Sequence, residues 1–240
     1  MSLELRQITF SHPGARPTSG PLLAGVNLRV GAGELVTLAA PSGAGKSTLL
    51  RIAALMTTAD AGVVALDGQP FAAGSPVPRQ ARRSVGVVLQ SPRLAADPRL
   101  RLESLICAPL AVRDGQLRPQ PRRHGDRVAE LCELAGLDVS LLRRYPHQVS
   151  DGQLQRAMVA RALALDPKVL VCDEPTAQLD AATTGSMLRL LASRAAAGAA
   201  VLVASHHRAA LARVANRSVE LADINPGAHA TRRVGPGTNP

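Results

Sequence analysis

The sequence predicts an α/β protein with a mainly parallel core sheet, antiparallel strands at the N-terminus and an inserted α-helical subdomain. Strand-sized apolar runs alternate with helical stretches after Leu35, a pattern typical of parallel sheets covered by helices on both faces. The first two expected strands have the short Pro/Gly-rich turn Gly14–Pro21 between them. From Leu100 to Leu165 the pattern becomes helical and richer in charge, which indicates the inserted subdomain.

The individual elements follow from local residue patterns. Strands are expected where short apolar runs lie between turn residues. In chain order they are Leu3–Phe10, Leu22–Val30, Leu35–Ala39, Gly62–Leu66, Val85–Leu89, Lys168–Cys172 and Ala199–Ala204. The main helices are expected at Lys46 to about Met56, Leu154 to about Leu165 and Ala181–Ala197. No internal repeat is visible, which argues against two fused copies of one domain.

Length and composition predict one large domain that is not an integral membrane protein. The 240 residues are 46% hydrophobic, and the longest clean apolar runs, such as Ala199–Ala204, have the length of a strand. The N-terminus lacks the charged-then-apolar pattern of a signal peptide, so we expect a soluble cytoplasmic protein. Cys107, Cys132 and Cys172 show no paired spacing, and we expect reduced, mostly buried thiols.

The net charge of +10 raises the hypothesis of nucleic-acid binding. Only Lys46 and Lys168 are lysines among 28 basic residues, so the arginine excess looks compositional. With one Tyr and two Phe, the chain also lacks an aromatic platform for single strands, and no nucleic-acid partner is expected. The segment Arg79–Arg123 holds ten arginines against three acidic residues, which suits a surface beside a membrane partner and anionic lipid.

A glycine-rich segment between an expected strand and an expected helix has the pattern of a phosphate-binding loop. It runs Ala40-Pro41-Ser42-Gly43-Ala44-Gly45-Lys46-Ser47, with alanine in place of the first glycine. Gly43 and Gly45 let backbone N–H groups turn toward phosphate oxygens. Lys46 can neutralise the β- and γ-phosphates, and Ser47 can offer its hydroxyl to Mg²⁺. The expected nucleotide contacts are Ser42, Gly43, Ala44, Gly45, Lys46, Ser47 and Thr48. The alternative is a turn that binds nothing.

Two carboxylates, Asp173 and Glu174, follow the buried strand Lys168–Cys172. Ligands of open parallel sheets bind at the carboxyl ends of the strands. Asp173 is placed to hold Mg²⁺, directly or through water, and Glu174 to orient and polarise an attacking water. The alternative is an acidic turn that faces solvent.

A third motif identifies the kind of nucleotide-binding protein. Ser150-Asp151-Gly152-Gln153 precedes an apolar helix and resembles the signature Leu-Ser-Gly-Gly-Gln of ABC ATPases. Together with the phosphate loop and the Asp-Glu strand end, in this order, it makes nearly the whole chain resemble the ATP-binding subunits of ABC transporters. The Ser150 side chain and the Gly152 N–H lie where they can bind a γ-phosphate. The alternative is an ordinary helix capped by Ser150.

The resemblance implies a P-loop NTPase (RecA-like) architecture. A single ABC ATPase domain would span residues 1–222, with its core at 1–92 and 166–222 and the helical subdomain at about 93–165. Residues 223–240 are rich in Pro and Gly and are expected to form a flexible tail. The implied cofactors are ATP and Mg²⁺.

The resemblance also gives roles to single residues. Gln90 matches the loop glutamine that contacts Mg²⁺ and water, and His206 matches the histidine that contacts the γ-phosphate. His12 takes the place of the aromatic residue that stacks on adenine. Asp180 takes the place of the aspartate that contacts the opposite subunit. The implied Mg²⁺ ligands are Ser47, Gln90 and Asp173, and the implied catalytic residues are Glu174, His206 and Gln90.

In this family two subunits enclose two ATP molecules, and the signature of each subunit serves the nucleotide of the other. Ser150, Gly152 and Gln153 would therefore act on the ATP of a partner. The first signature glycine is Asp151 here, and a carboxylate this close to a γ-phosphate is unfavourable unless it points away. This departure favours a heterodimer with a second, related ATPase subunit.

Two stretches narrow the resemblance to importers of dipeptides, oligopeptides or nickel. Asp97-Pro98-Arg99 is followed about ten residues later by Pro109-Leu110, and Arg144-Tyr145-Pro146-His147 precedes the signature. The chain ends soon after Glu220-Leu221, which favours the shorter nickel or metal-chelate members. The implied partners are two membrane permease subunits and an extracytoplasmic solute-binding protein. The ATPase would lie at the cytoplasmic face of the inner membrane as a peripheral protein.

Other functions stay open. An ABC exporter ATPase of similar size is one alternative, with the Asp97-Pro98-Arg99 region against it. A soluble role in translation or DNA maintenance is another, but neither a second ATPase domain nor a long coiled coil is present. A degenerate regulatory subunit is prompted by the departures at Ala40, Asp151 and His12. The pair His206 and His207 also allows a metal site, although no third ligand is evident.

Overall fold

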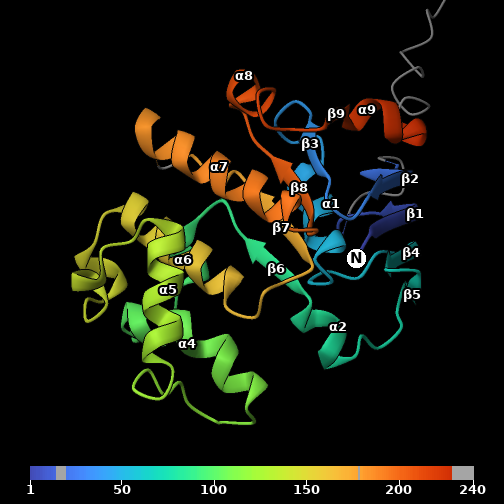
Figure 1. Cartoon of the computed structure of the whole chain (residues 1–240). Helices are drawn as coiled ribbons and strands as arrows, with labels where there is room; N and C mark the ends of the chain where they lie inside the picture. The colour runs from blue at the N-terminus through green and yellow to red at the C-terminus, as the bar shows by residue number, and fades with distance from the viewer. Residues whose placement is uncertain (15–19, 178, 229–240) are drawn as a thin grey trace, which may run out of the picture.

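The computed structural model describes residues 1–14, 20–177 and 179–228. A parallel sheet with the strand order β6-β7-β8-β3-β9 forms its centre (Figure 1). These strands are β3 (Leu35–Ala39), β6 (Val85–Val88), β7 (Val169–Asp173), β8 (Ala200–Ala204) and β9 (Arg217–Glu220).

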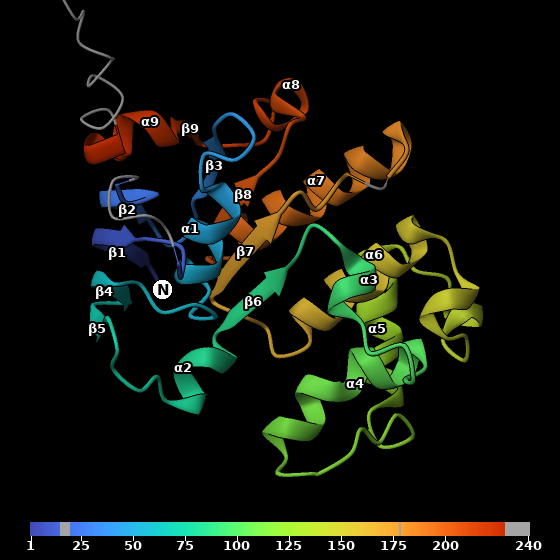
Figure 2. The same ribbon diagram turned by 180° about the vertical axis from the view of Figure 1, so that it is seen from behind.

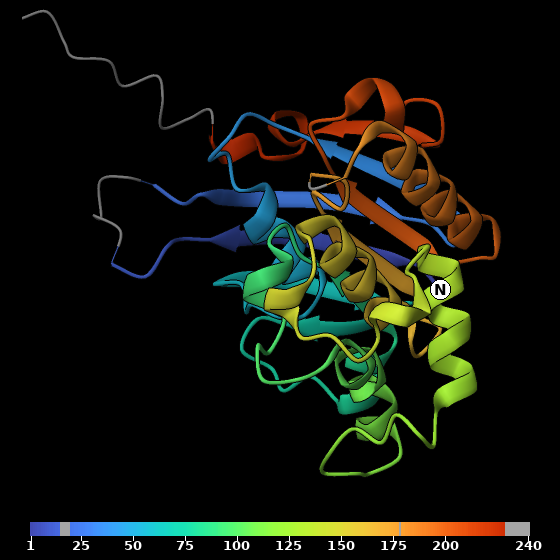
Figure 3. The ribbon, with the colours of Figure 1, turned by 90° about the vertical axis from the view of Figure 1, so that its left-hand side faces the viewer.

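A second, antiparallel sheet has the order β2-β1-β4-β5. Its strands are β1 (Leu3–Phe10), β2 (Leu23–Val30), β4 (Ala61–Leu66) and β5 (Gln69–Ala72). In Figure 3 the blue strands β1 and β2 extend away from the yellow-green helix α5 (Gly125–Ala135) and the orange helix α7 (Ala181–Ala196). The expected pairing of the first two strands is therefore present.

The strands of the parallel sheet are buried on both faces. In β7, Val169 and Val171 pack with the antiparallel sheet and helix α1 (Lys46–Ala53), whereas Leu170 and Cys172 pack with the helices on the other face. This is the two-residue alternation of side chains along a strand. It explains why these strands appear in the sequence as continuous apolar runs instead of alternating ones.

The helices fall into two groups around the parallel sheet. Helix α1 lies between the two sheets, and α4, α5 and α6 gather apart from the antiparallel strands (Figures 1 and 2). The remaining helices are α2 (Arg79–Arg83), α3 (Pro92–Ala95), α4 (Leu102–Arg113), α6 (Asp151–Leu163), α8 (Arg208–Leu211) and α9 (Leu221–Ile224), with 3₁₀ turns η2 (Val139–Leu141), η3 (Pro146–Gln148) and η4 (Pro226–Ala228). The predicted fold class is confirmed.

Several boundaries differ from the sequence predictions. Helix α1 ends at Ala53 instead of near Met56, because Leu55 adopts a positive φ of 59°. Helix α6 begins at Asp151, one residue after the cap that Ser150 provides. The short elements β5, α2, β9 and α9 are not predicted. For β5 the missed signal is Asp67-Gly68, whose φ values of 51° and 82° suit the tight turn of a hairpin.

Part of the expected tail is placed in the structure. Asp223 and Ile224 end α9, and Asn225 is 3% exposed. The Asn225 side chain accepts a hydrogen bond from the Ala24 N–H at 2.8 Å and donates one to the Leu22 carbonyl at 3.1 Å. These bonds fasten residues 223–228 to β2. Residues 229–240 of the expected tail, residues 15–19 of the expected turn and Gln178 after the Asp-Glu pair lie outside the described residues.

The three cysteines are buried and not bonded to one another. Burial raises the pKa of Cys132 to about 11 and also raises that of Cys172. Neither thiol is therefore ionised at neutral pH. In the described part of the chain, every helix is too short or too polar to span a bilayer.

Strand β6 lies so close to α6 that residue 86 has to be a glycine. A Cβ there would lie 2.6 Å from the Ala162 carbonyl oxygen and 2.9 Å from Leu170 Cδ1. We expect Gly86→Ala to lower the free energy of unfolding by about 1–3 kcal/mol, because backbone must shift. Gly125→Ala is the control, since a Cβ there meets nothing within 4 Å. Urea denaturation compares the two, and equal midpoints would contradict the close approach.

Candidate functional site

One cavity lies where the carboxyl ends of four parallel strands meet. The register pairs Leu38 and Asp173 with the same residue, Ala204, so the ends of β3, β7 and β8 are level. The cavity has a volume of about 220 Å³. It is lined by His12, Leu22, Ser42, Gly43, Gly45, Lys46, Ser47, Thr48, Gln90, Asp173, Glu174 and His206. Thus the structure brings together the residues predicted for the chain's own site, except Ala44.

The glycine-rich loop between β3 and α1 forms one wall. Gly45 has a φ of 101° and is the N-cap of α1, and Gly43 has a φ of 75°. A Cβ on Gly45 would also lie 3.1 Å from carbon atoms of Leu22 and Leu23. The Lys46 ammonium donates hydrogen bonds to the carbonyls of Ala40 at 2.7 Å and Pro41 at 3.1 Å. The loop therefore holds a cation and the positive end of a helix against the cavity.

Glu174 is a buried and strained residue in the opposite wall. It is 4% exposed, and its φ of 50° lies in the left-handed region. A residue other than glycine keeps such a φ only where the surrounding structure holds it in place. Its N–H continues the ladder by donating to the Ala204 carbonyl at 2.8 Å. Its Oε2 accepts a hydrogen bond from the His206 N–H at 3.1 Å. One carboxylate oxygen is thus held by the backbone just after β8.

The second oxygen of Glu174 is available to a ligand. Oε1 is buried and has no hydrogen-bond partner among the described residues, although His206 Nε2 lies 3.3 Å away. A buried carboxylate oxygen without a donor is costly, which suits a site completed by water or a cation. Asp173, 5% exposed, and the hydroxyl of Ser47 line the same cavity. Oxygen groups of this kind are what Mg²⁺ prefers, so the residues present fit this ion.

The signature residues lie outside this cavity. The Ser150 hydroxyl accepts a hydrogen bond from the Gln153 N–H at 3.2 Å, and Gln153 Oε1 accepts one from the Ser150 N–H at 2.9 Å. This reciprocal pair caps α6, of which Gly152 is the second residue. The Asp151 carboxylate forms an ion pair with Arg93 at 2.6 Å.

Asp180 also lies outside the cavity, as the N-cap of α7. It accepts a hydrogen bond from the Thr183 N–H at 2.9 Å, and this bond lowers the pKa of Asp180 below its usual value. The Thr183 hydroxyl in turn accepts a hydrogen bond from Arg156 at 2.6 Å. A lowered carboxyl pKa means that this stabilisation is present at neutral pH and is lost as the pH falls through the folded-state pKa.

Two further lining residues, His12 and Leu22, lie just after β1 and just before β2. The His12 ring packs edge-on against Phe10, with centroids 5.6 Å apart. Leu22 lines the cavity but is not predicted from the motifs. Its position follows from the pairing of Phe10 with Leu23 in the antiparallel sheet, which places the end of β1 beside the start of β2.

Comparison with known proteins agrees with this geometry. A model described as "ABC transporter" matches residues 23–177, which is more than half of the 240-residue chain. The chain belongs to the ABC transporter family.

Two curated relatives differ in length. A Brucella abortus protein named "Putative peptide import ATP-binding protein" is 39% identical over 188 residues, covering 74% of this chain and 54% of that protein. The chain thus spans about half the length of this relative. The lipoprotein-releasing system ATP-binding protein LolD of Ruegeria sp. is 37% identical over 226 residues, covering 93% of this chain and 96% of that protein.

Solved structures share the whole architecture. A dimeric post-hydrolysis structure of the ATP-binding cassette MJ0796, bound to ADP and Pi, superposes with a TM-score of 0.79. The two sequences are 28% identical, and the match covers 91% of this chain and 93% of that chain. The fold and the nucleotide-binding family are therefore shared over nearly all of the described residues.

Gly45 offers a direct test of the cavity. We expect Gly45→Ala to weaken binding of a fluorescent ATP analogue by about tenfold or more, because the left-handed backbone strains any side chain and its Cβ crowds Leu22 and Leu23. Gly68→Ala is the matched control, with a φ of 82° and open space around a Cβ. The control should lose some stability and keep its affinity. Equal affinities for both variants would contradict the role of the loop.

Proposed function

We propose that this chain is the ATP-hydrolysing, energy-coupling subunit of an ABC transporter. The observation that carries the proposal is the single cavity at the sheet edge. It places a phosphate-loop lysine, an Asp-Glu pair, a glutamine and a histidine around one space. These groups come from the ends of four strands, and together they match the needs of phosphoryl transfer to water.

In the proposed mechanism the loop binds the phosphates of ATP. Lys46 exchanges its bonds to the Ala40 and Pro41 carbonyls for oxygens of the β- and γ-phosphates. Backbone N–H groups at the start of α1 face the same charge. His12 and Leu22 stand at the mouth, where an imidazole face and an apolar side chain suit adenine.

Hydrolysis is assigned to Glu174. The His206 N–H fixes Glu174 Oε2, which leaves Oε1 to accept a hydrogen bond from the attacking water. His206 and Gln90 line the cavity on either side, where they orient the γ-phosphate and the water. Ser47, Asp173 and Gln90 would hold Mg²⁺. When bound, this ion offsets the negative charge of the β- and γ-phosphates.

A second subunit completes the proposed ATPase. Ser150, Gly152, Gln153 and Asp180 lie outside the cavity of their own chain, so we assign them to the nucleotide of a partner. The dimer of the related MJ0796 cassette supports an arrangement of this kind. We propose a heterodimer, because Asp151 makes the signature of this chain unlike the usual one.

For the transport system, we propose an importer of peptides, nickel or a metal chelate. The Asp97-Pro98-Arg99 region and the Brucella abortus relative support this subgroup. The partners would be two permease subunits and an extracytoplasmic solute-binding protein, with the ATPase peripheral at the cytoplasmic face of the inner membrane. The domain division, with a core at 1–92 and 166–222 and a helical subdomain at about 93–165, belongs to the same proposal.

Release of a lipid-anchored cargo is the second candidate. The LolD relative of Ruegeria sp. matches this chain over 96% of its own length, whereas the importer relative extends well beyond the match. An ATPase of that type would have the same catalytic cavity. The two candidates differ in their membrane partners, and only the importer needs a solute-binding protein.

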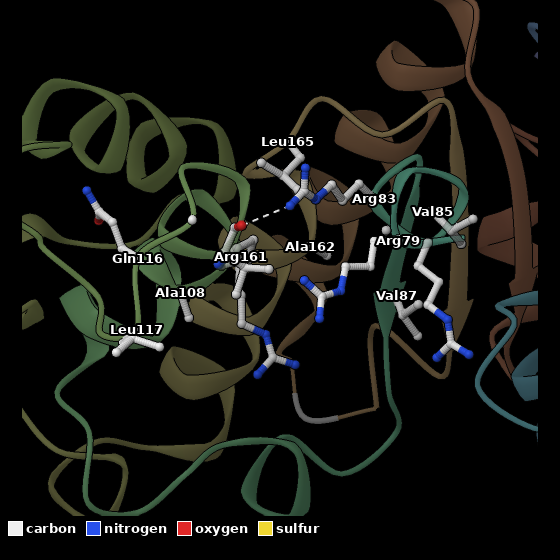
Figure 4. Close-up of a pocket in the computed structure, with 15 residues that line it drawn as sticks. Arg79, Arg83, Val85, Val87, Ala108, Gln116, Leu117, Arg161, Ala162 and Leu165 are labelled. Carbon is white, nitrogen blue, oxygen red and sulfur yellow. Dashed lines mark hydrogen bonds between the residues drawn. The ribbon is translucent and has the colours of Figure 1, made fainter. Parts of the chain in front are cut away.

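An arginine-rich cavity supports a surface for a membrane partner (Figure 4). It has a volume of about 770 Å³ and lies between α2, β6, α4 and the end of α6. Its lining includes Arg79, Arg82, Arg83 and Arg161 together with apolar residues of α4 and β6, and none of its lining residues is acidic. We propose that it receives a permease segment with carboxylates beside apolar side chains, because this charge needs a counter-charge.

Glu174→Gln is expected to lower ATP turnover about 100-fold or more and to spare ATP binding, because the amide no longer polarises the water. Turnover is measured in the complex purified with its membrane partners, and affinity with the isolated chain. Glu133→Gln, on the exposed face of α5, is the control and should keep full turnover. Full turnover in Glu174→Gln would refute the assignment, and a silent wild-type complex would support the degenerate alternative.

Affinity purification from detergent-solubilised membranes of the host identifies the partners. A second ATPase, two permeases and a binding protein are expected for an importer, and membrane subunits without a binding protein for the second candidate. Ribosomes or nucleic acid in their place would overturn the transport proposal. The double variant Arg79→Glu/Arg82→Glu should lose the membrane subunits, and Arg122→Glu/Arg123→Glu, with the same charge change on exposed residues, should keep them.

A further inference from the structure

Arg93 ties together two segments that serve different nucleotides. It lies in α3, three residues after Gln90, which lines the catalytic cavity. Its guanidinium donates to the Pro146 carbonyl at 2.9 Å through Nη1 and to the Val149 carbonyl at 3.1 Å through Nη2. Nη2 also forms the ion pair with Asp151 at 2.6 Å. One side chain thus contacts three residues of the segment 146–151, which ends in the signature.

The charge of Asp151 explains why such a contact matters. Asp151 follows Ser150 directly, at the N-terminus of α6, where the proposed function places a γ-phosphate of the partner. A free carboxylate there would repel this phosphate, since both carry negative charge. The Arg93 guanidinium offsets this negative charge and holds the Asp151 carboxylate on the side of α3. Both side chains are 43% exposed, so the pair sits at the surface where a second subunit would dock.

Helix α3 is held from its other end as well. Arg161 of α6 donates a hydrogen bond to the Ala95 carbonyl at 3.0 Å. Figure 2 shows α3 lying beside α6, in agreement with the contacts between them. The short helix is therefore fixed at Arg93 to the loop before α6 and at Ala95 to the last turn of α6. A displacement of the segment that carries Gln90 has to move the signature loop or break these bonds.

We propose that Arg93 is a positioning residue that neutralises Asp151 and couples the Gln90 segment to the signature loop. The inference rests on the proposed function, because it needs an anion at the signature. The consequence is a link between the two nucleotides. Gln90 senses the state of the chain's own nucleotide, and a movement of its segment changes the position of Ser150 relative to the nucleotide of the partner. The two catalytic sites of the dimer are then linked within each subunit by one arginine.

An ordinary surface ion pair is the competing explanation. Exposed pairs contribute little to stability, so a simple pair predicts no effect on turnover. Arg99, paired with Asp97 at 2.9 Å in the same segment and 86% exposed, is such a pair and supplies the control variant Arg99→Ala. Arg93 differs because it also donates to two backbone carbonyls, which a lysine with a single ammonium cannot reproduce in the same geometry.

The test compares Arg93→Ala, Asp151→Gly and the double variant in the complex purified with its partners. We expect Arg93→Ala to lower ATP turnover about tenfold or more, and Asp151→Gly to keep turnover. In the double variant the loss should be much smaller, since no carboxylate needs to be neutralised. Arg93→Lys should fall between wild type and Arg93→Ala. Arg99→Ala should match wild type.

A second measurement separates this inference from the proposed function. The affinity of the isolated chain for ATP depends on its own cavity, so Arg93→Ala should bind ATP as wild type does. Two results would overturn the inference: full ATP turnover in Arg93→Ala, or a loss of turnover that is equal with and without the Asp151 carboxylate. Neither result contradicts the proposed function as long as the chain binds ATP. A wild-type chain that binds no ATP would overturn both.

Discussion

The register of the parallel sheet is the constraint on which the site depends. Strands β3, β7 and β8 end level with one another, because Leu38 and Asp173 both pair with Ala204. These strands all run in the same direction, so their carboxyl ends lie at one edge of the sheet. The loop after β3, the carboxylates after β7 and the histidine after β8 therefore share one space. A slip of one residue in β7 would turn Glu174 away from this edge.

Burial of the sheet on both faces makes this register rigid. Alternate residues of each strand pack into two separate cores, one toward α1 and the antiparallel sheet, the other toward the helical part. Within this packing the strained φ of Glu174 persists, because its N–H is held by the last residue of β8 and its Oε2 by His206, two residues further on. The free oxygen of Glu174 is thus a product of the fold and not of the local sequence.

The helical part adds contacts that act across the surface of the subunit. The loop before α6 depends on Arg93 from α3, and the arginine cavity is shared by α2, β6, α4 and α6. In the loop before α6 the Arg93 charge is offset by Asp151, whereas the arginine cavity has no acidic residue in its lining.

Local sequence was sufficient for the motifs and for the long strands. The phosphate loop, the Asp-Glu strand end and the signature are contiguous runs whose residue types have direct chemical reasons, and continuous apolar runs mark strands buried on both faces. Tertiary structure alone decided the rest. The edge strand β9, the entry of Leu22 into the cavity, the pairing of Asp151 with Arg93 and the free oxygen of Glu174 arise between residues far apart in the chain. Such contacts depend on strand order and packing, which no local pattern contains.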